Sequence, residues 1–258
     1  MIKNAFKKDN ILYSIAGIFS LLEALYLLIE HLINAFIPFY SINSSLLSIF
    51  NVDGNLILSV ILYTALAVVL FKKQNCGTVT NISVCLTVLS AVTLSNGIWN
   101  SLYFLSNYVL KKYEPWYNKV LNLLEESNAI LTAVVFFITL LLIAVTSSLI
   151  NKGIKVKLAS TLSIIAIPSA VVWFILSRLG NLYSIIYAII CVNNKFYAYY
   201  YYSPFENLAQ TIFNVASSTI SGIFLVALVC LLALAFLKSA KKLNADEQTE
   251  DEIIEIID

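Results

Sequence analysis

Residues 11–37, ILYSIAGIFSLLEALYLLIEHLINAFI, decide the class of this protein. An α-helix needs about 20 mostly apolar residues to cross a bilayer, and this stretch exceeds that length. Five further stretches share its character, at about 52–71, 78–110, 129–150, 158–192 and 208–237. They show no alternation of period two, which excludes a membrane β-barrel. The sequence therefore predicts an all-α polytopic membrane protein with six transmembrane helices.

The overall composition leads to the same class. Apolar residues make up 60% of the chain and charged residues only 12%, with a mean hydropathy of +0.85. Soluble domains typically carry about 25% charged residues. The composition therefore excludes an ordinary water-soluble domain, a disordered chain and a nucleic-acid-binding protein.

Charge is distributed unevenly along the chain. Seven of the 15 acidic residues lie in 243–258, so this tail has a net charge of −7 and residues 1–242 have a net charge of +8. We expect residues 1–242 to form the transmembrane domain. We expect the acidic tail, residues 243–258, to be cytoplasmic and disordered, because it is too charged to fold alone.

The lysines predict the orientation of the helices. Eleven of the 16 basic residues lie before the first stretch and after the second, fourth and sixth, against five on the other side. By the positive-inside rule, both termini are cytoplasmic. No small-residue cleavage site interrupts the first stretch, which indicates a retained anchor rather than a signal peptide. We expect a multi-pass protein of the cell membrane.

The three predicted outer loops share a short pattern. Each contains a proline followed by an aromatic residue, and an Asn or Ser follows thirteen residues after the proline: Pro38 with Asn51, Pro115 with Asn128, and Pro204 with Ser217. This pattern predicts a helical hairpin used three times, an arrangement common in transporters. Six spans joined by short loops would also produce three hairpins without true repetition.

The fifth stretch is too long for a straight span. Its 35 residues would extend about 50 Å, against a hydrocarbon core of about 30 Å. Pro168 favours a kink, and Gly180 with Asn181 could turn the chain. Residues 182–192 would then be transmembrane, re-entrant or interfacial.

Two acids interrupt the first apolar stretch. Glu23 lies twelve residues, about 18 Å, into a helix that starts near Ile11, and Glu30 falls on almost the same face. A charged side chain near the bilayer centre costs about 2.5–3.5 kcal/mol and usually faces a partner or a cavity. These residues are therefore the first candidates for an ion or proton path.

Several polar residues share one predicted depth. Arg178 lies twenty residues into its stretch and Glu30 nineteen into its own. We expect an intramembrane polar cluster in which Glu30 pairs with Arg178, and the further members are His31, Asn96, Asn100 and Asn181. In the alternative, Glu30, His31 and Arg178 reach the outer headgroups by snorkelling.

Aromatic residues crowd the predicted outer loops. The candidates for an external binding platform are Trp116, Tyr199, Tyr200, Tyr201 and Tyr202. The alternative is the interfacial aromatic belt that membrane proteins carry at headgroup level. Four consecutive tyrosines cannot all face lipid, so the belt explains that run least well.

Small residues form faces suited to close helix packing. Ala16, Ser20 and Ala24 are spaced by four residues, as are Ser217 and Ser221. The first face would pack inside the bundle or against another membrane protein. The acidic tail would bind a cytosolic partner, fold back onto cytoplasmic lysines or stay solvated. The lipid bilayer is the one certain partner, and no nucleic acid is expected.

The sequence lacks the usual catalytic motifs. His31 is the only histidine, and the chain contains no H-E-x-x-H, G-x-S-x-G, Walker or G-x-G-x-x-G motif. We therefore expect no enzyme, no cofactor and no metal site. The favoured function is a small transporter or the membrane-embedded subunit of a transport system. The alternative is a non-catalytic scaffold, receptor-like or protective protein acting through its tyrosine-rich loops and acidic tail.

Overall fold

Six α-helices make up the regular structure of the described residues. The computed structural model describes residues 11–36, 54–72, 76–110, 116–193 and 204–257. The helices are α2 (Ile11–Phe36), α4 (Gly54–Phe71), α5 (Cys76–Leu110), α6 (Trp116–Lys152), α7 (Val156–Asn193) and α8 (Pro204–Ile257). Each contains a segment long and apolar enough to cross a membrane. The predicted all-helical class with six membrane-spanning segments is confirmed in length and composition.

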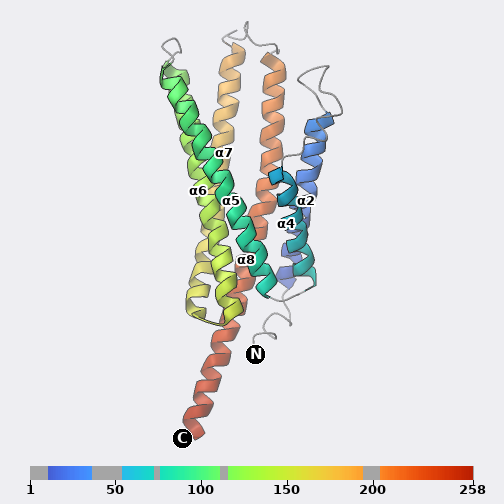
Figure 1. Ribbon diagram of the computed structural model, residues 1–258, viewed down its shortest axis with the longest axis vertical. Helices are drawn as coiled ribbons and strands as arrows, with labels where there is room; N and C mark the ends of the chain where they lie inside the picture. Colours follow the sequence, from blue (N-terminus) through green and yellow to red (C-terminus); the bar gives the residue numbers. More distant parts are fainter. Residues whose placement is uncertain (1–10, 37–53, 73–75, 111–115, 194–203, 258) are drawn as a thin grey trace.

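The helices run along one long axis and form a closed ring (Figure 1). α2 packs between α4 and α8, and the ring continues through α7, α6 and α5 back to α4. α6 also contacts α8 across the ring. α6 and α7 pack about as extensively as α7 and α8, so the described helices form one bundle rather than separate pairs.

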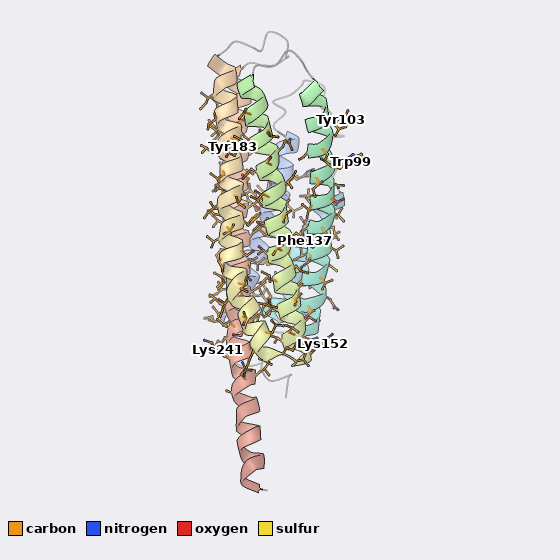
Figure 2. All side chains as sticks on the ribbon, turned by 90° about the vertical axis from the view of Figure 1, so that its left-hand side faces the viewer. Trp99, Tyr103, Phe137, Lys152, Tyr183 and Lys241 are labelled. Carbon is orange, nitrogen blue, oxygen red and sulfur yellow. The ribbon has the colours of Figure 1, made fainter. Side chains whose placement is uncertain are left out.

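The two ends of the bundle differ in chemistry. Figure 2 shows Lys152 and Lys241 at one end, here called the lysine end, and Trp99, Tyr103 and Tyr183 toward the opposite end, here called the aromatic end. α2 begins at the lysine end, which fixes the depth of its residues along the bundle axis (Figure 1).

The bundle is apolar outside and tightly packed inside. Large apolar side chains cover its surface, as lipid requires, while Leu66, Leu70 and Phe236 are buried on its axis. Ala159 and Ala233 are fully buried and let neighbouring helices approach closely. The buried polar residues are mostly Ser and Thr, and several of them donate to a carbonyl of their own helix, as Ser163 does to Ala159.

The turn between α6 and α7 fixes these two helices side by side. Gly153 has a positive φ of 64°. Its N–H donates to the Ile150 carbonyl at 3.2 Å, and the N–H of Ile154 donates to the Leu149 carbonyl at 3.2 Å. This is a Schellman cap, which ends α6 and starts a short connection to α7.

α6 begins earlier than its apolar composition predicts. It starts at Trp116 rather than near residue 129 and has 37 residues. The segment 116–128 is polar, but it contains no Pro or Gly that would stop a helix. The apolar composition identifies the membrane segment of α6. The helix itself extends further, because no Pro or Gly stops it before Trp116.

α7 is continuous, which corrects the expected turn at Gly180 and Asn181. The helix runs through Pro168 and both of these residues to Asn193, so residues 182–192 are not a separate re-entrant or interfacial segment. Gly180 lies instead where α7 meets α6, since a Cβ there would be 2.9 Å from Nδ2 of Asn128. Its role is close packing rather than a change of direction.

The acidic tail also differs from the expectation of disorder. α8 continues without a break from Pro204 to Ile257 and projects beyond the bundle at the lysine end (Figure 1). Extending an existing helix avoids the cost of nucleating a new one, and the tail contains neither Pro nor Gly. The 54-residue α8 is therefore a packed helix with a helical extension.

Candidate functional site

Glu23 of α2 is buried deep in the bundle. Its side chain is 1% exposed, and it lies about 18 Å along α2 from the lysine end. The hydroxyl of Ser221 on α8 donates to Oε1 of Glu23 at 2.8 Å. Oε2 is buried and has no hydrogen-bond partner among the described residues. Half of this carboxylate is therefore free to accept a proton or a cation.

A second carboxylate contacts α8 nearer the aromatic end. Oε1 of Glu30 accepts a hydrogen bond of 2.5 Å from the Ser217 hydroxyl. The same hydroxyl bonds to the phenol of Tyr26. Because Ser217 has only one proton to donate, it accepts from Tyr26 when it donates to Glu30. Tyr26, Ser217 and Glu30 thus form a relay in one direction.

Arg178 of α7 contacts α8 from another side. Its guanidinium donates to the Thr219 hydroxyl, to the Ser218 carbonyl at 3.0 Å and to the neighbouring Ser177 hydroxyl at 2.8 Å. It also lies 5.0 Å from the centre of the Phe174 ring, a cation–π contact. These neutral groups share the positive charge without a carboxylate among them.

The expected ion pair between Glu30 and Arg178 is replaced by contacts with α8. Glu30 bonds to Ser217 and Arg178 to Thr219, and no ion pair joins the two groups, both of which the structure describes. Residues two apart on a helix point about 200° from each other. Ser217 therefore faces α2, whereas Thr219 faces α7. Glu30 and Arg178, which the sequence predicts at the same depth, thus lie on different sides of one turn of α8.

Glycine brings α7 close to this turn of α8. A Cβ at Gly222 would lie 3.0 Å from the Phe174 ring and 3.4 Å from Nη2 of Arg178. A larger residue would push the guanidinium away from Ser218 and Thr219. Ser218 and Gly222, one turn apart on α8, thus leave space for Arg178.

The four remaining predicted members of the cluster differ in where the structure places them. Asn181 joins the layer, because its amide donates to the Ser218 hydroxyl at 2.9 Å. His31, beside Glu30 in sequence, is half-buried, and its Nε2 has no hydrogen-bond partner in the described part of the chain. Asn96 is exposed and lines a cavity on α5, away from Glu30 and Arg178. The side chain of Asn100 lies outside the described residues.

Sequence reasoning missed two acids. Glu125 accepts a 2.8 Å bond from Ser184 of α7, and Glu126 accepts a bond from Ser101 of α5. Both were assigned to an outer loop because they precede the apolar part of α6. The unbroken run without Pro or Gly from residue 116 was the signal that these acids belong to the same helix.

The predicted outer platform lies outside the described part of the chain. This holds for Tyr199, Tyr200, Tyr201 and Tyr202 and for the side chain of Trp116. The small-residue face of α2, in contrast, is resolved. Ala16, Ser20 and Ala24 are at most 2% exposed, and Ser20 donates to the Tyr63 carbonyl of α4 at 2.7 Å. This face packs inside the bundle and is not available to a partner protein.

The polar layer formed by Glu23, Glu30, Arg178 and the α8 residues that they contact therefore places proton donors next to proton acceptors. The carboxylates of Glu23 and Glu30 meet α8 through serine hydroxyls, and the charge of Arg178 lies on the other side of that helix. Within the described residues, no three His, Cys, Asp or Glu side chains are grouped to hold a metal ion. Comparison with protein-family models, curated proteins and solved structures finds no match to this chain.

Proposed function

We propose that this chain is a small transporter, or the membrane-embedded subunit of a transport system, and that Glu23 and Glu30 carry a proton or another small cation between α2 and α8. The observation that carries the proposal is the Glu23 carboxylate, which is buried at mid-depth and whose Oε2 has no hydrogen-bond partner among the described residues. An acid is rare at this depth and costly to keep there, and such residues commonly belong to ion paths.

The arrangement between the two acids supports a path along α2. Glu23 and Glu30 are seven residues apart, about 10.5 Å along the helix axis. Tyr26 lies between them in sequence, and its hydroxyl bonds to Ser217, which donates to Glu30. Hydroxyls both donate and accept protons. The distance is too long for the acids to share a reacting group, which favours transport over hydrolysis.

The orientation belongs to the same proposal. The spans form three helical hairpins in the cell membrane, with both termini in the cytoplasm and the lysine end inside. The support is the exposed Lys72, Lys152 and Lys241 at one end and the exposed Trp99 and Tyr103 toward the other. The protein is proposed to be non-enzymatic.

Flux measurements on the reconstituted protein test the proposal. Purified full-length chain is placed in vesicles containing a pH-sensitive dye, and a K⁺ diffusion potential drives ion movement. The unmodified chain is expected to acidify the vesicles, and Glu23→Gln and Glu30→Gln to reduce the signal to that of empty vesicles. Parallel experiments with Na⁺ gradients distinguish a proton from a metal cation.

Glu126→Gln is the matched control, because it removes an intramembrane acid that faces α5 rather than α8. It should retain the flux. If all three variants fold and show the same flux as the unmodified chain, the transport proposal is refuted. That result would favour the scaffold or receptor-like function. For that function, only substitutions in the four tyrosines or in the acidic tail should change activity.

A further inference from the structure

Among the described residues, the short α4 leaves part of α5 without a neighbouring helix on that side. α4 has 18 residues and α5 has 35, and the two helices pack less extensively than α5 and α6 do. Ser59 of α4 and Thr93 of α5 line one cavity, and α4 begins only five residues before Ser59. Toward the aromatic end beyond this level, α5 has no α4 beside it.

Three cavities follow one another from the uncovered face into the bundle. The first, about 470 Å³, is open and lies along α5 at Leu94, Asn96 and Trp99. The second, about 120 Å³, is more enclosed, shares Leu94 and lies between α4, α5 and α6. The third, about 20 Å³, shares Leu86 with the second and reaches α8. Because neighbouring cavities share lining residues, we treat the three as one groove that narrows inward, here called the α5 groove.

The α5 groove spans the depth of one leaflet. Asn96 lies twenty residues from the start of α5, about 30 Å along its axis, and Leu86 lies about 15 Å along it. The hydrocarbon core is about 30 Å thick, so these residues fall near the headgroup boundary and the midplane respectively. This length matches a single acyl chain of one leaflet.

Polarity changes along the α5 groove in the order that a lipid requires. At the open end Ser95 and Asn96 are exposed and Trp99 is 72% exposed, and Trp prefers the headgroup level. At the closed end the lining is mostly apolar, with Leu86 and Phe136 among its members, and Tyr63 and Ser83 also line it. The hydroxyls of Ser90 and Thr93 on the way donate to carbonyls of their own helix, so they present little unsatisfied polarity to a hydrocarbon chain.

We propose that the α5 groove binds a membrane lipid of the leaflet at the aromatic end. Its headgroup lies at Ser95, Asn96 and Trp99, and one acyl chain passes Leu94 to end beside Phe136. The amide of Asn96 and the hydroxyl of Ser95 donate to ester or phosphate oxygens. This site is independent of Glu23 and Glu30 and needs no transport activity.

The narrowing of the groove selects a lipid over a partner helix. An α-helix with side chains is about 10–12 Å wide and does not fit cavities of about 120 and 20 Å³. The end of a flexible chain fits the cavity of about 120 Å³, whereas the cavity of about 20 Å³ has room for about one methyl group. A second groove, of about 490 Å³, lies on the outer face of α5 and α6 at Val88 and Val145. Val88 and Val145 are exposed on the outer surface of the bundle, so this groove provides a control surface.

Photo-labelling tests the site on the full chain. The protein is reconstituted in phosphatidylcholine vesicles that contain a phosphatidylcholine with a diazirine at the end of one acyl chain. After illumination, labelled residues are mapped by mass spectrometry. We expect label concentrated on Leu86, Phe136 and Leu140. Even labelling of these residues and of Val88 and Val145 would refute a bound lipid, as would a cross-link to a second protein in their place.

Matched substitutions sharpen the test. Ala133→Trp fills the second cavity and should abolish labelling of Leu86 and Leu140, whereas Val145→Trp on the control groove should leave it unchanged. Size-exclusion chromatography checks that both fold. Leu94→Trp blocks the passage from the first cavity to the second and replaces Ala133→Trp if that variant aggregates. Labelling that survives a folded blocking variant would overturn the proposal.

Discussion

Ser221 of α8 donates a 2.8 Å hydrogen bond to Oε1 of Glu23, and Oε2 of that carboxylate has no partner among the described residues. A buried acid with half of its hydrogen-bonding capacity unused lowers stability, because an unsatisfied buried group costs about 1–3 kcal/mol. The bundle thus keeps Glu23 at a cost in stability. That cost is what makes Glu23 a functional candidate, and it leads to measurable effects at its neighbours.

Ser221→Ala should destabilise the bundle by about 1–3 kcal/mol, because both oxygens of Glu23 then lack a partner. Thermal unfolding in detergent measures the effect. Thr161→Ala is the control, since the exposed Thr161 bonds only to the Lys157 carbonyl of its own helix. Equal stability of the two variants would show that Ser221 does not support Glu23.

Arg178→Lys should lower stability although it keeps the positive charge. The guanidinium reaches Ser177, Ser218 and Thr219 at once, and a lysine ammonium cannot reproduce this fork. We expect a loss of about 1–2 kcal/mol in unfolding free energy. Lys152→Arg, at the end of the bundle, should change it by less than about 0.5 kcal/mol. An unchanged unfolding midpoint for Arg178→Lys would mean that the positive charge alone, and not the shape of the guanidinium, contributes to stability.

Gly222→Ala and Gly97→Ala should have opposite effects. A Cβ at Gly222 lies 3.0 Å from the Phe174 ring, so the ring and Arg178 must shift, at about 1–3 kcal/mol. A Cβ at Gly97 meets nothing within 4 Å, so the change removes only the helix penalty of glycine and stabilises by about 0.5–1 kcal/mol. Denaturant titrations of both variants decide; stabilisation by Gly222→Ala would contradict the close approach of α7 and α8.

Tyr26→Phe and Ser217→Ala should not be additive. Tyr26 donates to Ser217 and Ser217 donates to Glu30, so removing Ser217 already breaks both bonds. A double-mutant cycle should give a coupling free energy of about 0.5–3 kcal/mol. The pair Ser184→Ala and Ser217→Ala, which contacts different acids, serves as the uncoupled control. A coupling near zero for Tyr26 and Ser217 would rule out the relay.

The sequence predicts which residues belong to the polar layer better than it predicts the hydrogen bonds between them. Depth counted along each helix places Glu30 and Arg178 together, and both bond to the same turn of α8. Their direct pairing could not be excluded from depth, because the sequence does not specify which helix lies between α2 and α7. Ser217 and Ser221 were recognisable as small residues, but only their neighbours reveal them as hydrogen-bond donors to the acids.

The ends of the helices show the same limit. Apolarity identifies the membrane segment of α6, yet the helix begins at Trp116 and brings Glu125 and Glu126 into contact with α7 and α5. Glycine is typical of turns, but Gly180 lies within α7 and packs closely against Asn128 of α6. At Gly180 the neighbouring helix α6 decides between two conformations that the local sequence permits.

The sequence by itself determined six membrane-spanning helices, the depth of Glu23 along α2 and the uneven distribution of lysines. These follow from local quantities, namely apolarity, helical rise and charge. Only the tertiary structure decided that Ser221 supports Glu23, that α8 separates Glu30 from Arg178 and that the short α4 opens a groove beside α5. Such contacts depend on the order of helices around the ring and on their rotation, and the packing of side chains between helices fixes both.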